Sequence, residues 1–339
     1  MDQRKPTSFE MNYNKSFAVS RRSFLQKAGL TGLALPLAGH QLFSNNTTSL
    51  SSPAPFISTN TIRMHKVAVF SKALQWTELN QMADMVAESG IDGLDLTVRP
   101  GGHVEPERVK DDLPKIAEAM KKVGKEIVMM TTAIGGADEP YTKDILTTAR
   151  QLGIGFYRMN WYSYDKLQSI DDNLQAFVKR MAALAEMNKA SNIKAGYQNH
   201  AGTGFGSPVW DLVQVLRQVN SPWVGSQYDI RHAVVEGANS WPLGFDQVQP
   251  FINTIVMKDF YWSKNNGKWS VTNVPLGEGM VDFKAYKDKV ATLSPVLPIT
   301  IHQEYDLGGA EHGNRKANIT EAQMLAAMKK DLAFVKNNI

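Results

Sequence analysis

The feature that most constrains the fold of this chain is an alternation, repeated eight times after residue 62, of a short apolar run with a longer helix-like stretch. Such alternation is typical of parallel strands joined by crossover helices. The runs are apolar on both faces, which indicates strands that are buried on both sides. The predicted strands are His65–Ser71, Gly93–Val98, Glu126–Thr132, Phe156–Asn160, Lys194–Gln198, Val224–Tyr228, Thr254–Met257 and Ile299–Gln303.

A helix is predicted after each of these strands. Eight strand–helix units is the number found in a closed barrel, so we predict an α/β fold with a single (β/α)8 TIM barrel over residues 62–339. An open, doubly wound sheet is the alternative, but no Gly-rich phosphate-binding loop follows the first strand, where that fold would need one. The predicted helices are Leu74–Ser89, Pro106–Val123, Tyr141–Leu152, Ile170–Asn192, Val209–Val219, Pro242–Phe251, Phe283–Leu293 and Thr320–Asn338.

The N-terminal segment, residues 1–40, is typical of a targeting signal. Ser20–Lys27 reads SRRSFLQK and resembles the twin-arginine export signal, and the mildly apolar stretch Ala28–Ala38 follows it. That stretch is too short to span a membrane, so we expect a cleaved signal, no stable membrane anchor and a periplasmic location. Residues 41–61 are rich in Ser, Thr, Asn and Pro and are predicted to be a linker. A basic disordered arm followed by a short helix is the alternative for the N-terminal segment.

The charge of the chain argues against a nucleic-acid partner. The formal net charge is +4, but six of the 37 basic residues and only two of the 33 acidic residues lie in residues 1–40, which leaves 31 of each. A neutral body without a basic stripe is not expected to follow a phosphate backbone. The chain has no cysteine, which excludes disulfides, thiolate metal sites and a cysteine nucleophile. The oligomeric state, including a homodimer, stays open.

Polar side chains gather where the predicted strands end, which is where barrel enzymes carry their chemistry. One such residue alone would most often be a loop hydrogen-bonding group, but their joint placement at one rim predicts a site. The strand-end segments are Asp95–His103, Arg158–Trp161, Tyr197–His200, Gln227–His232, Lys258–Asp259 and His302–Tyr305.

Six segments follow one another in an order and spacing that is specific as a set: Gly90–Leu96, Tyr197–His200, Asp229–His232, Met257–Asp259, Gly277–Phe283 and Ile301–Tyr305. Through these segments the chain, from about residue 64 to its C-terminus, resembles the xylose-isomerase-like sugar isomerase/epimerase barrels. The resemblance implies a divalent metal (Mn, Mg or Co), held by Glu after strand five, Asp after strand six, His after strand seven and Glu after strand eight.

Two of the four implied metal ligands are present and two are replaced. Asp229 and Glu304 match the pattern, Gln198 stands where the family has Glu, and Val256 stands where it has His. Gln198 can still offer a carbonyl oxygen, whereas Val256 cannot ligate a metal. The expected metal ligands are therefore Gln198, Asp229 and Glu304. Whether a histidine substitutes for Val256 stays open, the candidates being His200, His232 and His302.

The chemistry implied by the resemblance is removal of a proton next to a carbonyl. This reaction requires a base and a positive charge near the enolate oxygen. The expected catalytic residues are Glu304, His200 and His232 as acids or bases, with Lys258 to hold negative charge. We therefore expect a metal-assisted isomerase or epimerase acting on a small sugar or keto-sugar. Elimination or hydrolysis of a glycoside, hydrolysis of a phosphodiester and a non-catalytic carbohydrate-binding barrel are the alternatives. The expected substrate-binding residues are Arg99, Arg158, Asn160, Trp161, Asn199 and Glu278.

Overall fold

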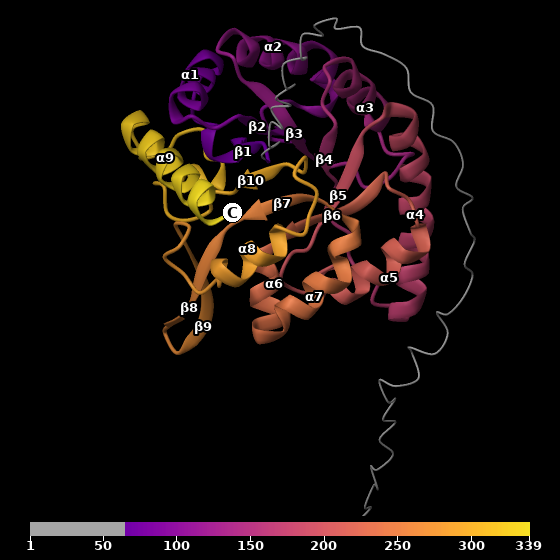
Figure 1. Ribbon diagram of the computed structural model, residues 1–339. Helices are drawn as coiled ribbons and strands as arrows, with labels where there is room; N and C mark the ends of the chain where they lie inside the picture. Colours follow the sequence, from indigo (N-terminus) through magenta and orange to yellow (C-terminus); the bar gives the residue numbers. More distant parts are fainter. Residues whose placement is uncertain (1–64) are drawn as a thin grey trace, which may run out of the picture. The chain divides into compact units, whose positions relative to one another are not determined.

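Eight parallel strands close into a barrel in the computed structural model, which describes residues 65–339 (Figure 1). The first strand, β1, pairs with β2 on one side and with β10 on the other, and these pairings close the ring. The predicted TIM barrel is therefore confirmed. The predicted signal (residues 1–40) and linker (residues 41–61) lie outside the described residues. The barrel strands are β1 (Val67–Phe70), β2 (Gly93–Val98), β3 (Glu126–Thr132), β4 (Phe156–Arg158), β5 (Lys194–Gln198), β6 (Val224–Asp229), β7 (Ile252–Met257) and β10 (Ile299–Ile301).

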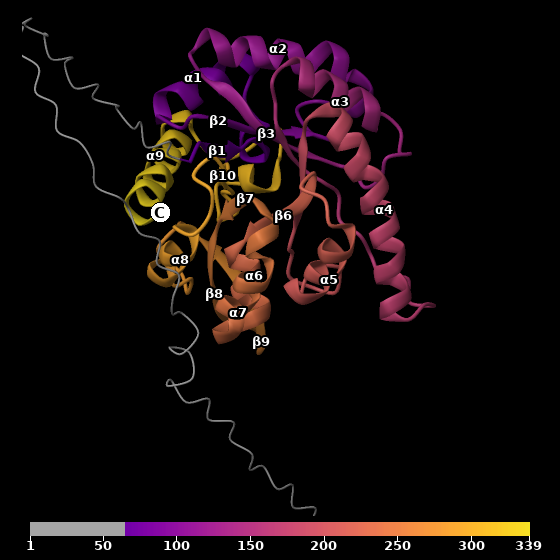
Figure 2. The same ribbon diagram turned by 45° about the vertical axis from the view of Figure 1, so that its right-hand side comes forward.

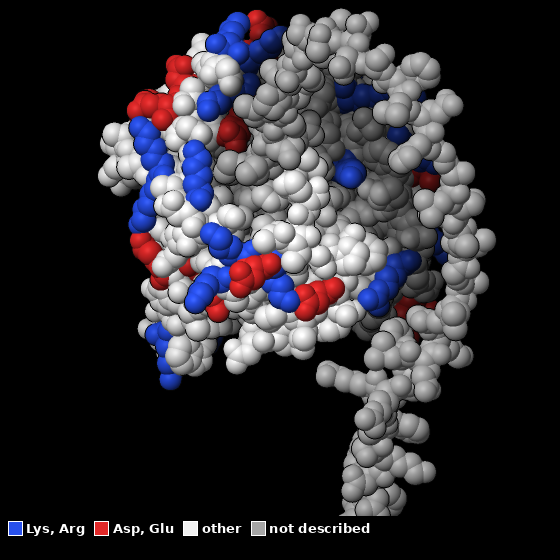
Figure 3. Space-filling model, viewed as in Figure 1, with Lys and Arg blue, Asp and Glu red and all other residues white. Residues whose placement is uncertain are grey.

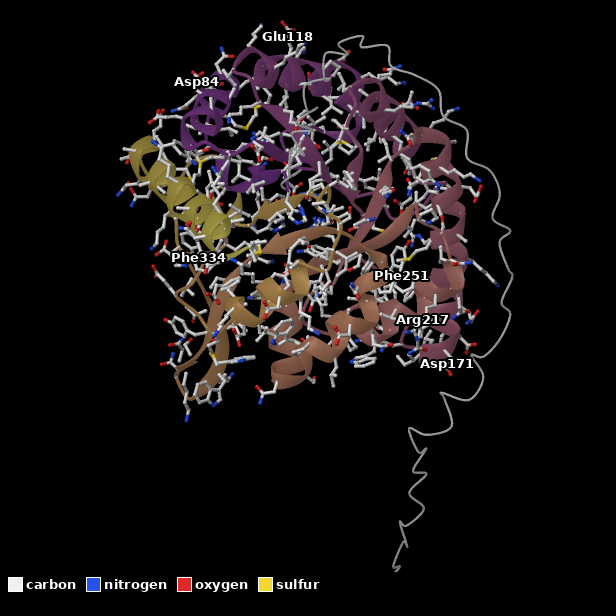
Figure 4. All side chains as sticks on the ribbon, in the orientation of Figure 1. Asp84, Glu118, Asp171, Arg217, Phe251 and Phe334 are labelled. Carbon is white, nitrogen blue, oxygen red and sulfur yellow. The ribbon has the colours of Figure 1, made fainter. Side chains whose placement is uncertain are left out.

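The helices surround this barrel, as the two ribbon views show (Figures 1 and 2). Each turns an apolar stripe inward and a polar face outward, so that Asp84 and Glu118, labelled in Figure 4, lie on the outside. In the part of the chain that the structure covers, no helix has the length and apolar character needed to cross a membrane. The helices are α1 (Leu79–Ser89), α2 (Val109–Lys122), α3 (Thr142–Gln151), α4 (Ile170–Ser191), α5 (Val209–Val219), α6 (Ile230–Gly237), α7 (Trp241–Val248), α8 (Phe283–Val290) and α9 (Glu321–Asn338).

The last helix, α9, shows how local sequence and packing agree. The Thr320 hydroxyl accepts from the backbone N–H of Gln323, and the Gln323 side chain accepts from the N–H of Thr320, which completes a capping box. Near its other end, Phe334 packs edge-to-face against Phe283 of α8, with ring centroids 4.9 Å apart (Figure 4). A Cβ at Gly277 would lie 2.3 Å from the Phe334 ring, so only glycine permits this close contact.

Two elements differ from the sequence-based prediction. A short helix, α6, begins directly at the end of β6, inside the predicted strand-end segment Gln227–His232. An antiparallel hairpin of β8 (Asp259–Asn265) and β9 (Lys268–Val274) follows β7 and was missed. Its turn is Asn266–Gly267, both with positive φ, which matches the twist of a tight hairpin.

The hairpin and the segment after it are tied to the barrel by one carboxylate. Asp259 accepts hydrogen bonds from the backbone N–H groups of Phe260, Gly277, Gly279 and Val281, at 2.8, 3.0, 2.9 and 3.2 Å. This connection gives a physical reason for the presence of both Lys258-Asp259 and Gly277-Glu278-Gly279 in the sequence: the backbone of the second segment donates to the aspartate of the first. It also holds the residue before it, Lys258, at the end of β7.

On the face shown in Figure 3, Lys and Arg side chains lie interspersed with Asp and Glu and do not form a patch of one sign. This distribution agrees with the balanced charge of the chain after residue 40.

Candidate active site

The centre of the candidate site is the side-chain nitrogen of Lys258, which lies where the strands end at the C-terminal mouth of the barrel. Lys258 Nζ lies 2.8 Å from Asp229 Oδ2 and 3.3 Å from Glu304 Oε2. His232 Nε2 lies 2.9 Å from the same nitrogen. The lysine side chain is 3% exposed, so two carboxylates from β6 and from the segment after β10 converge on a buried ammonium.

Asp229 is held from several sides. It caps the N-terminus of α6, where Oδ1 accepts the backbone N–H of His232 at 3.2 Å. Its other oxygen, Oδ2, accepts from Gln198 Nε2 at 2.8 Å, while Gln198 Oε1 accepts from the guanidinium of Arg158 at 3.3 Å. The Gln198 amide thus turns its N–H2 toward Asp229, because an oxygen there would face another oxygen.

Both nitrogens of His232 are already engaged. Nδ1 faces two donors, the backbone N–H of Ala201 at 3.1 Å and the Arg231 guanidinium at 2.8 Å. Burial and the neighbouring Lys258 hold the pKa of His232 well below its ordinary value, so the ring is neutral at neutral pH. A neutral imidazole has one N–H and one ring nitrogen with a lone pair. On one side of the ring that lone pair accepts from Ala201 N–H or Arg231, and on the other side it accepts from the Lys258 ammonium. In either tautomer, therefore, the lone pair of His232 faces a donor of the protein and is not free.

Glu304 is the most accessible carboxylate of the cluster, with a side chain that is 25% exposed. Burial by itself raises the pKa of Glu304, but Lys258, His302 and Lys72 outweigh this effect and hold the pKa well below its ordinary value. The Lys72 ammonium lies 3.6 Å from Glu304 Oε1, and His302 Nδ1 lies 3.8 Å from it. Glu304 is therefore an ionised carboxylate that solvent can reach.

His302 is positioned by a fully buried aspartate. Asp95 Oδ2 lies 3.3 Å from His302 Nε2, and the hydroxyl groups of Thr131 and Thr300 donate to the same carboxylate. The imidazole also stacks on the Phe70 ring, with centroids 4.2 Å apart. These contacts fix the ring so that its other nitrogen points toward Glu304.

Positive charge exceeds negative charge around this cluster. Burial lowers the pKa of Arg158 to about 10, which leaves it charged at neutral pH, and its guanidinium lies 4.2 Å from the Trp161 ring centroid. The guanidinium of Arg99 lies over the Phe70 ring, 5.6 Å from its centroid. Five cationic side chains therefore face three carboxylates, which favours an anion in the site. The cations are Lys72, Arg99, Arg158, Arg231 and Lys258, and the carboxylates are Asp95, Asp229 and Glu304.

Three of the remaining expected site residues lie exposed at the mouth of the barrel. The rings of His200 and Trp161 pack edge-to-face with centroids 4.9 Å apart, and the ring centroids of His200 and His232 are 4.0 Å apart. Burial and then Lys258 lower the pKa of His200, which keeps its ring neutral at neutral pH. Asn160, although exposed beside them, has its side-chain oxygen bonded to the backbone N–H of Trp161.

Two expected substrate-binding residues have other roles in the structure. Asn199 is fully buried, and its amide bonds to both the N–H and the C=O of Asp229, so it joins β5 to β6. Glu278 is exposed and forms an ion pair with Lys330 of α9. Asn199 thus positions Asp229, and Glu278 is held by an outer helix instead of joining the cluster around Lys258.

Sequence reasoning missed Lys72 as a member of the cluster. Asp95 lay in a predicted strand-end segment but was given no role, and His302 was considered only as a metal ligand. Lys72 lies two residues after the end of β1, and Asp95 lies inside the buried β2. A charged residue within an apolar strand, or shortly after one, was the available signal in both cases. The partnership of Asp95 with His302 could not be read from the sequence, because 207 residues separate them.

The residues at this site do not fit the divalent metal that the resemblance implies. The Lys258 ammonium fills the space between Asp229 and Glu304, and the Gln198 amide presents donors instead of a carbonyl oxygen to Asp229. Val256 pairs in register beside Asp229 and offers no ligand atom. Within residues 65–339 no group of three or more His, Cys, Asp or Glu side chains is arranged to hold a metal ion.

A closed parallel barrel with acid, base and cationic side chains at the carboxyl ends of its strands defines the class of protein. The sequence profile described as "Xylose isomerase-like TIM barrel" matches residues 83–322. The chain therefore belongs to the xylose isomerase-like TIM barrel family. No curated protein matches the sequence.

Solved structures share this fold at low sequence identity. The chain is similar to the zinc-bound IOLI protein, with a TM-score of 0.64 and 14% identity over 81% of this chain and 99% of that chain. It is similar to L-ribulose 3-epimerase, with a TM-score of 0.60 and 14% identity over 81% and 94%. It is also similar to 3-keto-D-glucoside 4-epimerase from E. coli, with a TM-score of 0.59 and 11% identity over 80% and 99%. At these identities the similarity shows the fold.

Proposed function

We propose that the chain is a sugar-modifying enzyme of the isomerase and epimerase class, which removes a proton next to the carbonyl of a small sugar or keto-sugar. The observation that carries the proposal is the pair at the mouth: an ionised, solvent-reachable Glu304 carboxylate 3.3 Å from the Lys258 ammonium. A base and a cation at this separation suit a reaction in which a carbon loses a proton and a neighbouring oxygen gains negative charge.

Each group has a distinct task in this proposal. The Glu304 carboxylate takes the proton, and the electrons of the broken C–H bond form the C=C bond of an enolate, whose oxygen becomes anionic. The Lys258 ammonium and the nearby guanidinium of Arg158 lower the energy of that oxyanion. His302, held by Asp95, keeps the Glu304 carboxylate in place. Delivery of a proton to the other face of the same carbon, from a donor on that face, gives an epimer. Return of the proton to the adjacent carbon, while the hydroxyl proton of the first carbon passes to the enolate oxygen, gives an isomer.

The mouth also suits a carbohydrate. Trp161 is 39% exposed beside His200, and an exposed indole can stack on the apolar face of a sugar ring. The neutral imidazole of His200 adds a second acid–base group at the rim. Two of the similar structures, L-ribulose 3-epimerase and 3-keto-D-glucoside 4-epimerase, are named for action on sugars, which supports this substrate class.

Deuterium exchange tests the proposal without knowledge of the product. The purified protein is incubated in deuterated water with ketoses, aldoses and 3-keto-glycosides, and the substrates are then examined by NMR and mass spectrometry. We expect deuterium at the carbon next to the carbonyl for at least one sugar class. Release of an alcohol from a keto-glycoside would mean that the same proton abstraction leads to elimination. Absence of exchange across the panel would contradict the proposal.

Two variants assign the exchange to this site. Glu304→Gln removes the base and is expected to slow exchange by about 100-fold or more, the usual contribution of a positioned acid or base. Glu118→Gln changes an exposed glutamate on the outer side of α2 and is expected to exchange like the wild type. Equal exchange in Glu304→Gln and the wild type would place the base elsewhere.

A further inference from the structure

We propose that the ammonium of Lys258 takes the place of a divalent cation in this barrel, so that the site works with a built-in monovalent cation and does not bind a metal. This inference deepens the proposed function and rests on it only for the catalytic role of the ammonium. The claim about metal binding stands on the geometry of the site.

The first argument is the position of the ammonium. The two carboxylates that remain from the implied ligand set, Asp229 and Glu304, both contact Lys258 Nζ, at 2.8 and 3.3 Å. A cation that bridged these carboxylates at ordinary coordination distances of about 2.0–2.6 Å would lie almost on top of the nitrogen. The ammonium and a dication would also repel each other in a buried place, where charge interactions are screened little.

The second argument is that the lone pairs of the other nearby groups already face donors of the protein. Gln198 turns its N–H2 toward Asp229 because its oxygen accepts from Arg158. Both ring nitrogens of His232 face donors, Ala201 N–H and Arg231 on one side and the Lys258 ammonium on the other. Because metal ligation needs a lone pair, neither residue can complete a coordination shell without giving up these bonds.

The third argument is the register of the strand that supplies Lys258. Val256 lies opposite Asp229 in the β6–β7 pairing, so a side chain at this position is placed beside the carboxylate. Residues two apart on a strand project to the same side, which gives Lys258, two residues further along, a path to the same space. The valine fills the place next to Asp229 with methyl groups, and the longer lysine side chain delivers the charge.

The chemical consequence is a different electrophile. An ammonium offers one positive charge and N–H donors to a developing oxyanion, and it can pass a proton to that oxygen. Glu304, which receives part of its charge compensation from Lys258 and Lys72, remains available as a base instead of being committed as a ligand.

Metal binding measured directly tests the inference. The full-length protein is exchanged into EDTA, returned to EDTA-free buffer with Mn²⁺, Co²⁺ or Mg²⁺, and analysed by elemental mass spectrometry and thermal shift. We expect no retained metal and an unchanged melting temperature for the wild type. Retention of one equivalent, or a clear upward shift with any of the three ions, would overturn the inference. This measurement needs no variant to fold.

A set of variants makes the same test in the other direction. Lys258→Met combined with Gln198→Glu and Val256→His rebuilds the four-ligand pattern, and we expect it to bind Mn²⁺ at least about tenfold more tightly than the wild type, since carboxylate charge then lacks its ammonium. Lys329→Met, which removes an exposed lysine of α9, is the control for the loss of a lysine charge away from the site and should bind no metal. Tighter binding in this control than in the rebuilt site would overturn the inference.

The outcomes separate this inference from the proposed function. Exchange of deuterium that persists in EDTA supports both. A stoichiometric metal that is needed for exchange overturns the inference and leaves proton abstraction in place. Absence of both metal and exchange supports the inference and contradicts the proposed function.

Discussion

Asp259→Asn is expected to lower the stability of the protein substantially, although it changes only one oxygen to nitrogen. The carboxylate accepts four backbone N–H groups, two on each oxygen; one belongs to Phe260 of β8, and three belong to the segment that returns from the β8–β9 hairpin to α8. Burial raises the pKa of Asp259, and these N–H groups counteract part of that effect. Asparagine can present its single oxygen to only two of the four donors, and its N–H2 group would face the other two.

The magnitude follows from those two lost contacts. A buried donor left without a partner costs about 1–3 kcal/mol, so two of them predict a loss of roughly 3 kcal/mol. For a chain of this size about 2–4 °C corresponds to 1 kcal/mol, which gives a decrease in melting temperature of about 6–12 °C. Gly279 cannot move closer to compensate, because its Cα already lies so near that a Cβ would be 2.2 Å from Asp259 Oδ1.

Thermal and urea unfolding followed by circular dichroism measure this effect. Asp288→Asn is the matched control, because Asp288 is an exposed residue of α8 and the same chemical change there should leave the melting temperature within about 1 °C, as for most surface substitutions. A loss below about 0.5 kcal/mol in Asp259→Asn would refute the reasoning, since it would mean that the N–H groups find other acceptors at no cost.

Three further predictions concern packing, pH and export. Gly93→Ala should lower the free energy of unfolding, measured with urea, by at least about 1 kcal/mol, because a Cβ there would lie 2.0 Å from the backbone oxygen of Glu126; an unchanged free energy of unfolding would contradict this close approach. Burial raises the pKa of Asp331, so the folded state holds its proton more tightly than the unfolded state, and that stabilisation is lost as pH rises through the folded-state pKa; the wild type should therefore lose melting temperature relative to Asp331→Asn above about pH 4, and parallel curves would contradict it. We propose that residues 1–40 export the protein to the periplasm, so Arg21→Lys with Arg22→Lys should leave it in the cytoplasm in cell fractionation; periplasmic recovery would remove the argument.

The barrel could be predicted because its signal is repeated and local. Each strand is an apolar run bounded by polar or glycine residues, and each helix carries an apolar stripe. Because this pattern repeats eight times, an error in one strand–helix unit does not change the predicted fold. The hairpin escaped prediction because its strands are buried only at the start of β8, are elsewhere exposed or half-buried, and lack a continuous apolar side. Its Asn266–Gly267 turn was a readable signal between them. The helix α6 escaped because it is short and its first turn carries Arg231 and His232.

The site could be predicted as a set of positions but not as a set of contacts. The rule that chemistry follows strand ends located Lys258, Glu304 and Arg158 without any knowledge of their partners. Two of the expected substrate-binding residues have protein partners that their residue type does not reveal. Asn199 has its amide satisfied by the backbone of Asp229, and Glu278 pairs with Lys330 on α9. Such partnerships depend on which side chains meet across elements, and a single sequence does not contain that information.

The replacement of the family's glutamate by Gln198 and the position of Lys258 have one electrostatic explanation. An ammonium carries a single positive charge, so it can balance fewer carboxylates than a dication can. A glutamate in place of Gln198 would add a third carboxylate against Asp229, at the 2.8 Å separation now bridged by an amide N–H. The neutral amide removes that repulsion and donates to Asp229, while its oxygen engages Arg158. Gln198 and Lys258 therefore act together: the lysine supplies the cation, and the glutamine keeps the negative charge within what one ammonium can stabilise.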